Sequence, residues 1–170
     1  MKRFITFLSI VVFIASAGFS QSTKFGHINS DELIQSMPEY DSAQAKLENF
    51  RKELVNNLQL MSVELNNKSE AYNKESKNLT DIVKQTKEQE LVDLNKRIQD
   101  FQQKAQEDLQ NKQVELFQPI YAKVDKAIKE VGKENGFLYV FDTAKGAVLY
   151  VDETKSTNIM PLAKAKLGLK

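Results

Sequence analysis

Few side chains in this 170-residue sequence could do chemistry by themselves. It has no cysteine and a single histidine, His27, which excludes disulfides, thiol catalysis and any metal site or proton relay built from two histidines of one chain. His27 lies in a short apolar segment, and two roles are open to it. It could be a pH-sensitive group at a subunit interface, or a partly buried histidine that is hydrogen-bonded within a strand. The second role is the more common.

Three carboxylates near the middle of the chain, Glu88, Glu90 and Asp93, could suggest a cation site. Three lysines are interleaved with them: Lys84, Lys87 and Lys96. This mixture favours a solvated helix face on which neighbouring charges pair. The sequence also has no nucleophile–base pair, glycine-rich phosphate loop or metal-ligand motif. We therefore expect no catalytic residues, no cofactor and no metal, and we do not predict an enzyme.

The charge balance argues against a nucleic-acid partner. The chain has 24 Lys and Arg against 23 Asp and Glu, whereas proteins that bind DNA or RNA usually carry an excess of basic residues to neutralise phosphates. The charge is nevertheless unevenly distributed. Residues 38–118 carry a net charge of −3 and residues 119–170 a net charge of +3.

The first twenty residues have the order of a secretory signal peptide. Lys2 and Arg3 precede an apolar run over residues 4–15, and small residues follow it. The run is too short to cross a bilayer, which needs about twenty residues. Cleavage before Gly18 or before Gln21 fits equally well, and the absence of cysteine excludes lipoprotein processing. We therefore assign residues 1–20 to a signal peptide and expect the mature chain to work outside the cytosol.

Residues 38–118 are predicted to form a long antiparallel helical hairpin, or arm. Pro38 suits the first position of a helix, and no Gly or Pro follows until Pro119. Apolar residues recur at steps of three and four, as in coiled coils. The first seam comprises Tyr40, Ala43, Leu47, Phe50, Leu54, Leu58, Met61 and Leu65, and the second comprises Leu91, Leu94, Ile98, Phe101, Ala105, Leu109 and Leu116.

The break between these seams is weak. We place the tip near residues 78–86, where Thr80 or Asp81, and alternatively Thr86, could cap the second helix. Folding there puts Tyr40 opposite Ile120, and gives each arm of about forty residues a reach of roughly 60 Å. The alternative is one uninterrupted helix in a parallel dimer, which the matched arm lengths disfavour.

The two ends of the chain, residues 21–37 and 119–170, are predicted to form a small β-rich body. Strands are expected over residues 24–28, 137–141 and 147–151, the last two joined by a turn. Short helices are expected after Ser30 as N-cap, over residues 122–133 up to Gly136, and over residues 159–167 up to Gly168. The fold class is therefore α+β, mostly α, with helical-hairpin arms on a β-rich body.

A body of this size is marginal alone, because its short strands leave unpaired edges and its apolar strand needs a cover on both faces. Assembly of several copies through the strands would meet both needs, so we predict an oligomerisation body. The candidate contact residues are Phe25, Ile28, Leu138, Val140, Val148 and Tyr150. The number of subunits does not follow from this argument.

The segments around residues 24–30, 137–142 and 148–152, together with the helical hairpin between them, resemble the Skp (OmpH) family of periplasmic chaperones. The resemblance covers essentially all of the mature chain, and the terminal strand segments are its most specific parts. It implies a homotrimer in the periplasm whose arms enclose a cavity and hold unfolded outer-membrane proteins without ATP. Familiar members are strongly basic, whereas these arms are slightly acidic, so we transfer no lipopolysaccharide site.

A holdase surface should offer weak, dispersed apolar contacts on a polar background. At 100° per residue, four apolar side chains point away from the seams and are our client-contact candidates: Leu60, Val63, Ile82 and Val92. Isolated exposed apolar residues are also ordinary features of protein surfaces. The main alternative function is an exported coiled-coil spacer or adaptor with one fixed protein partner.

Overall fold

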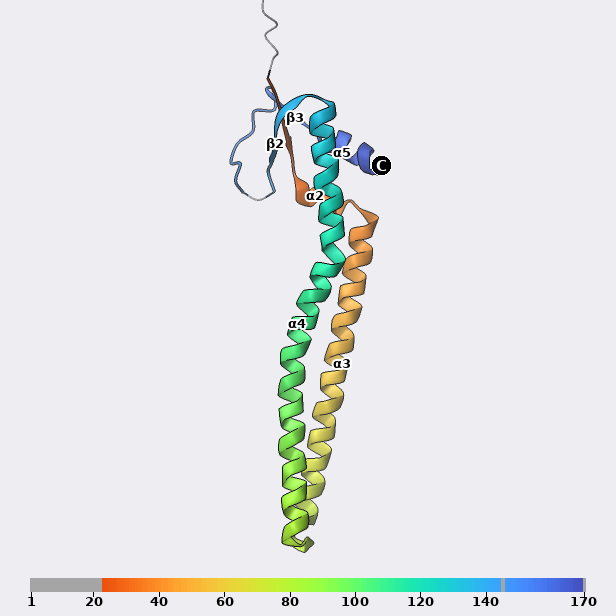
Figure 1. Ribbon diagram of the computed structural model, residues 1–170, viewed down its shortest axis with the longest axis vertical. Coiled ribbons are helices and arrows are strands. Elements are labelled where there is room, and N and C mark those ends of the chain that lie inside the picture. Colours follow the sequence, from red (N-terminus) through yellow and green to blue (C-terminus); the bar gives the residue numbers. More distant parts are fainter. Residues whose placement is uncertain (1–22, 145, 170) are drawn as a thin grey trace, which may run out of the picture.

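The computed structural model describes residues 23–144 and 146–169, so the predicted signal peptide lies outside the described residues. A long two-helix arm extends from a small body that both ends of the described chain build together (Figure 1). The mostly α, α+β class predicted from the sequence is confirmed. The alternative, one uninterrupted helix, is excluded because two helices pair side by side in the arm.

The arm consists of α3 (Pro38–Glu75), a short 3₁₀ turn, η1 (Ser76–Asn78), and α4 (Asp81–Glu134). Pro38 begins α3, as predicted, because its missing N–H costs nothing in a first helical turn. The tip lies at residues 76–80, at the early edge of the predicted range. Thr80 is the N-cap residue of α4, whereas Thr86 lies inside the helix and donates its hydroxyl to the Ile82 carbonyl oxygen at 3.0 Å.

The two helices pair about residue 80, as the seams predict. Near the tip, Lys87 lies 3.9 Å from Glu75, and Lys68 lies 3.8 Å from Glu90. At the base, the ring of Tyr40 meets that of Phe117 edge-on, with centroids 5.5 Å apart. This contact is about one helical turn from the predicted partner of Tyr40.

The sequence prediction is wrong about the helix that enters the body. A separate helix was expected over residues 122–133, with Pro119 marking the end of the arm, but α4 continues through Pro119 to Glu134. Proline removes one helical hydrogen bond, yet buried side chains on both sides of it, among them Phe117, Ile120 and Val124, hold the helix in place. The last sixteen residues of α4, 119–134, are thus the central helix of the body.

The sheet contains β1 (Lys24–Ile28), β2 (Phe137–Asp142) and β3 (Ser156–Asn158) in the order β2-β1-β3, and both neighbours run parallel to β1. The predicted strand over residues 147–151 does not form in this chain. The residues after β2 turn toward β1 instead of back along β2, because the Thr143 amide donates to the Ile28 carbonyl oxygen at 2.9 Å. The following loop then crosses to the far edge of β1.

The N-cap of the short helix α2 (Ser30–Gln35) is also not the predicted Ser30. The side chain of Asn29 accepts a hydrogen bond from the Glu32 amide at 3.1 Å. Ser30 is the first residue of the helix, and its amide and hydroxyl donate to the Asp142 carboxylate at 3.1 and 2.5 Å. Ser30 therefore forms hydrogen bonds to the aspartate at the end of β2 and does not cap α2.

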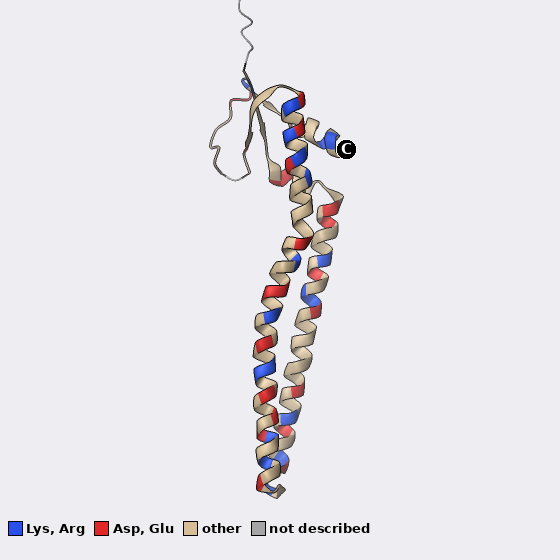
Figure 2. Cartoon of the chain, in the orientation of Figure 1, with Lys and Arg blue, Asp and Glu red and all other residues tan. Residues whose placement is uncertain are grey.

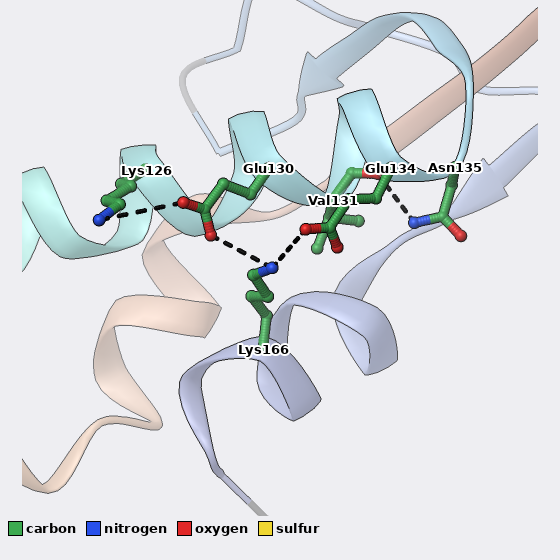
Figure 3. A network of polar contacts seen from close by, with 6 residues as sticks. All are labelled: Lys126, Glu130, Val131, Glu134, Asn135 and Lys166. Carbon is green, nitrogen blue, oxygen red and sulfur yellow. Dashed lines mark hydrogen bonds and ion pairs between the residues drawn. The ribbon is translucent and has the colours of Figure 1, made fainter.

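The core lies where β1, α2, α4 and α5 (Met160–Leu167) meet, and Ile28, Leu33, Met37 and Ile159 are almost fully buried in it. The helix α5 ends at Gly168, whose φ of 72° suits a glycine C-cap. Lys166 fastens α5 to α4, because its ammonium lies between the carboxylates of Glu130, at 3.3 Å, and Glu134, at 2.5 Å (Figure 3).

Candidate functional site

The outer faces of the arm carry apolar side chains that the seams do not use. The four client-contact candidates are all exposed: Leu60 by 67%, Val63 by 43%, Ile82 by 79% and Val92 by 61%. They come from both helices and are spread from the middle of the arm to its tip. Their exposure matches the helical wheel on which they were chosen, whereas their contact with a client stays a prediction.

Sequence reasoning missed three further exposed apolar residues on the arm: Val83, beside Ile82 at the tip, and, nearer the body, Val55 and Val114. Val55 and Val114 lie off the seam on the same helical wheel, so extending the wheel over the whole of α3 and α4 would have found them. With them, the apolar outer surface reaches down the arm toward the body. It forms scattered single contacts rather than one pocket.

Charged residues of both signs surround these apolar side chains along the arm (Figure 2). Most pair along one helix, and a few join the two helices near the tip. There the Tyr72 hydroxyl donates to the Glu88 carboxylate, which raises the pKa of Tyr72 above its usual value. Exposed pairs of this kind add little stability individually, so they keep the surface soluble without locking it.

The aromatic face of the sheet is a second exposed apolar surface. Phe25 stacks on Tyr139, with ring centroids 6.4 Å apart, and both rings lie beside Phe141, at 6.3 and 6.0 Å. All three side chains are at least partly accessible to solvent in the isolated chain. A hollow of about 550 Å³ between these strands and the loop over residues 147–152 continues the apolar surface.

The six oligomerisation candidates fall into two groups. Ile28 is buried in the body of its own chain, and Val140 packs against that core. Leu138 and Tyr150 are 61% and 81% exposed, and Phe25 is also accessible. Val148 is partly buried in the loop that replaces the expected strand. Four of the six are therefore accessible to another copy, and Leu149, which was not predicted, is the most exposed apolar residue of the loop.

The opposite side of β2 forms a groove of about 870 Å³ with the body half of α4. Its apolar walls include Ile34, Val124, Ile128 and Leu138.

His27 lies on the central strand, is 8% exposed, and has Nδ1 2.9 Å from the Ser156 hydroxyl oxygen. Of its two predicted roles, the structure therefore supports the hydrogen-bonded strand histidine.

Within the part of the chain that the structure describes, no group of three His, Cys, Asp or Glu residues is placed to hold a metal ion. None of the described helices is both long and apolar enough to span a membrane. The features that remain as candidate sites are two exposed apolar surfaces, one along the arm and one on the body. Both suit protein contacts.

Known proteins resemble this chain in sequence and in fold. The Chaperone protein Skp of Yersinia enterocolitica is 25% identical over 169 residues, covering 98% of this chain and 100% of that protein. The Chaperone protein Skp of Pectobacterium atrosepticum is 24% identical over 156 residues, covering 92% and 93%. The crystal structure of an OmpH-like outer membrane chaperone from Caulobacter crescentus superposes with a TM-score of 0.73 at 14% identity, covering 85% of this chain and 83% of that one.

The family model described as outer membrane protein (OmpH-like) also matches this chain. It spans residues 24–167, from the first residue of β1 to the last residue of α5, and so includes both the sheet and the arm. The chain belongs to the OmpH-like family.

Proposed function

We propose that this protein is an ATP-independent periplasmic holdase, which binds unfolded outer-membrane β-barrel proteins between its arms and prevents their aggregation. The observation that carries the proposal is the series of exposed apolar side chains on the outer faces of a hairpin whose own seam is already paired. Single exposed apolar residues are common on protein surfaces, whereas a series of them along both helices, with Leu60, Ile82 and Val92 among them, would give a client several weak contacts. The names of the related chaperones support the same class of activity.

The dispersed pattern suits an unfolded client better than a folded one. An extended chain has no fixed surface, so a specific pocket would hold only one segment of it. Single apolar side chains separated by charged and amide residues offer many weak contacts, and the client can exchange among them. Such binding requires neither nucleotide nor cofactor. It suits the periplasm, to which the predicted signal peptide would direct the chain and where ATP is absent.

A cavity requires several arms, and we propose that the body assembles copies of the chain into a homotrimer, as the family resemblance implies. The sheet has only three short strands, and β2 lies at its edge. Exposed edges and exposed apolar faces favour association. Phe25, Leu138, Val148 and Tyr150 are the accessible candidates for this contact. Ile28 and Val140 would support it from beneath.

The acidic arm limits what else we assign to the surface. Residues 38–118 carry a net charge of −3, and anionic headgroups would be repelled rather than attracted by such a surface. The proposal therefore includes neither lipopolysaccharide nor a membrane surface nor nucleic acid as a partner.

The direct test is suppression of aggregation. Several unrelated outer-membrane barrel proteins, unfolded in urea, are diluted into buffer with the mature protein, and light scattering is followed without nucleotide. A holdase suppresses scattering by all of them at a near-stoichiometric ratio of assembly to client. Suppression of none, together with capture of one folded partner, would instead identify the exported spacer or adaptor.

A further inference from the structure

The chain passes twice through the joint between the arm and the body, and each of these two segments contains a proline. On one side, Met37 is extended and Pro38 begins α3. On the other side, α4 passes through Pro119 without ending. Figure 1 shows α4 bending where the arm joins the body. Sharp bends in helices usually have a local cause, most often proline.

Pro119 supplies that cause in two ways. It has no N–H, so the Glu115 carbonyl oxygen loses its helical donor, and its ring crowds that carbonyl. Pro119 is itself exposed and lines a groove of about 540 Å³ that faces the start of α3. The groove also contains Met37, Pro38 and Ala43, so Pro119 faces the segment where α3 begins.

Contacts across the joint fix the bend instead of leaving it free. Lys123, one turn beyond Pro119, lies 2.5 Å from Glu39 in the first turn of α3. The hydrogen bond from Lys123 lowers the pKa of Glu39, so this carboxylate is ionised at neutral pH. The rings of Tyr40, Phe117 and Tyr121 pack in sequence beside it, with centroids 5.5 and 6.2 Å apart.

The body provides a firm base for the bend. Beyond the joint, Val124, Ala127 and Val131 of α4 are buried against the core. The Lys166 ammonium ties α5 to the same helix through Glu130 and Glu134 (Figure 3). A change of angle at the joint therefore swings the arm while the body half of α4 stays in place.

We propose that Pro119 is a positioning residue that sets the angle between arm and body, with the Glu39–Lys123 pair holding that angle. The arm multiplies any change at this point. From Pro119 to the start of α4 at Asp81 the helix is about 57 Å long, so a change of about 20° moves the tip by roughly 20 Å. Within the proposed function, on which this inference rests for its biological meaning, such a shift would alter the cavity that several arms enclose.

The test measures the angle within one chain and needs no client. Because the sequence has no cysteine, spin labels can be placed at Asn67→Cys on the arm and Ala165→Cys on α5, both exposed sites. Labelled chains are mixed with excess unlabelled protein, so that only distances within one chain are read by double electron–electron resonance. Circular dichroism and the melting temperature report whether each variant is folded.

The expected results differ between three variants. The part of α4 that lies opposite Asn67 is roughly 39 Å along the helix from Pro119. A change of about 20° at Pro119 therefore moves a label on residue 67 by about 13 Å. We expect Pro119→Ala to shift the mean distance by about 5 Å or more, and Lys123→Gln to broaden the distribution. Pro161→Ala, in the first turn of α5, is the matched control and leaves it unchanged.

A folded Pro119→Ala variant whose mean distance stays within about 2 Å of the parent would overturn the proposal. Because the readout involves neither assembly nor client, this outcome would leave the holdase function untouched. Conversely, a protein that fails to suppress aggregation could still show the predicted shift. The two proposals therefore fail separately.

Discussion

Replacing the four exposed client-contact candidates by glutamine should weaken client binding without unfolding the arm. The residues are Leu60, Val63, Ile82 and Val92, between 43% and 79% exposed. Glutamine is a good helix former, so the helices should persist. None of the four belongs to a seam, so the pairing of α3 with α4 should also survive.

The magnitude follows from the apolar area that a client would cover. Complete burial of one such side chain is worth about 1.5–3 kcal/mol. A client that covers part of what is exposed gains about 0.5 kcal/mol per side chain, or about 2 kcal/mol for four. This corresponds to a Kd about 30-fold weaker.

The assay is fluorescence titration of an unfolded barrel protein, with circular dichroism to check helicity. A control variant replaces exposed asparagines of the same helices by serine, at Asn57, Asn66, Asn67 and Asn95. The control should bind like the parent. A quadruple glutamine variant with normal helicity and a Kd within threefold of the parent would refute the assignment of these residues.

Three further predictions concern the body. Gly26→Val should destabilise it by about 1–3 kcal/mol in urea unfolding, because even a Cβ at this position lies 3.1 Å from Ile159; an unchanged midpoint would contradict this packing. Ile159→Ala should cost about 2–5 kcal/mol, since the side chain is fully buried, and a loss below 1 kcal/mol would show that the site collapses freely. Hydrogen bonds to Glu134 and Glu130 raise the pKa of Lys166, so their stabilisation of α5 is complete below the ordinary lysine pKa and is lost as the pH rises through the raised value. Hydrogen exchange of α5, corrected for its intrinsic pH dependence, should therefore become faster in that alkaline range. A Lys166→Met variant should lack this change with pH.

The arm could be predicted from the sequence because its signals are local and repeated. The spacing of the seam residues from Tyr40 to Leu65 specifies a helix and its buried stripe together. The match of the two seam lengths then specifies the hairpin. The seams also predict the register of the two helices, which fold about residue 80. Lys68, Tyr72 and Glu75 of α3 each contact a residue of α4 near the position that this register predicts.

The body was harder to predict, because its pattern depends on contacts between distant segments. The apolar run over residues 147–151 has the composition of a strand, but no strand of the described part of the chain pairs with it. The Ser156–Asn158 segment pairs with β1 instead, although it is short and polar. Pro119 misled in a similar way, since the packing around Phe117 and Ile120 carries the helix through it.

The client-contact residues could be chosen from the sequence only by exclusion. A helical wheel identifies apolar side chains that avoid the seam, and the structure finds all four exposed. It cannot distinguish a binding surface from incidental exposure, because both consist of single apolar residues among charges. That distinction requires a measurement of binding.

The most direct test of the central claim is the native mass of the mature protein, alone and mixed with urea-unfolded barrel protein. The proposal predicts a defined oligomer, a trimer by family resemblance, at micromolar concentration, and a second species heavier by the mass of the unfolded client. A monomer whose mass does not change when the client is added would contradict both the assembly and the holdase function.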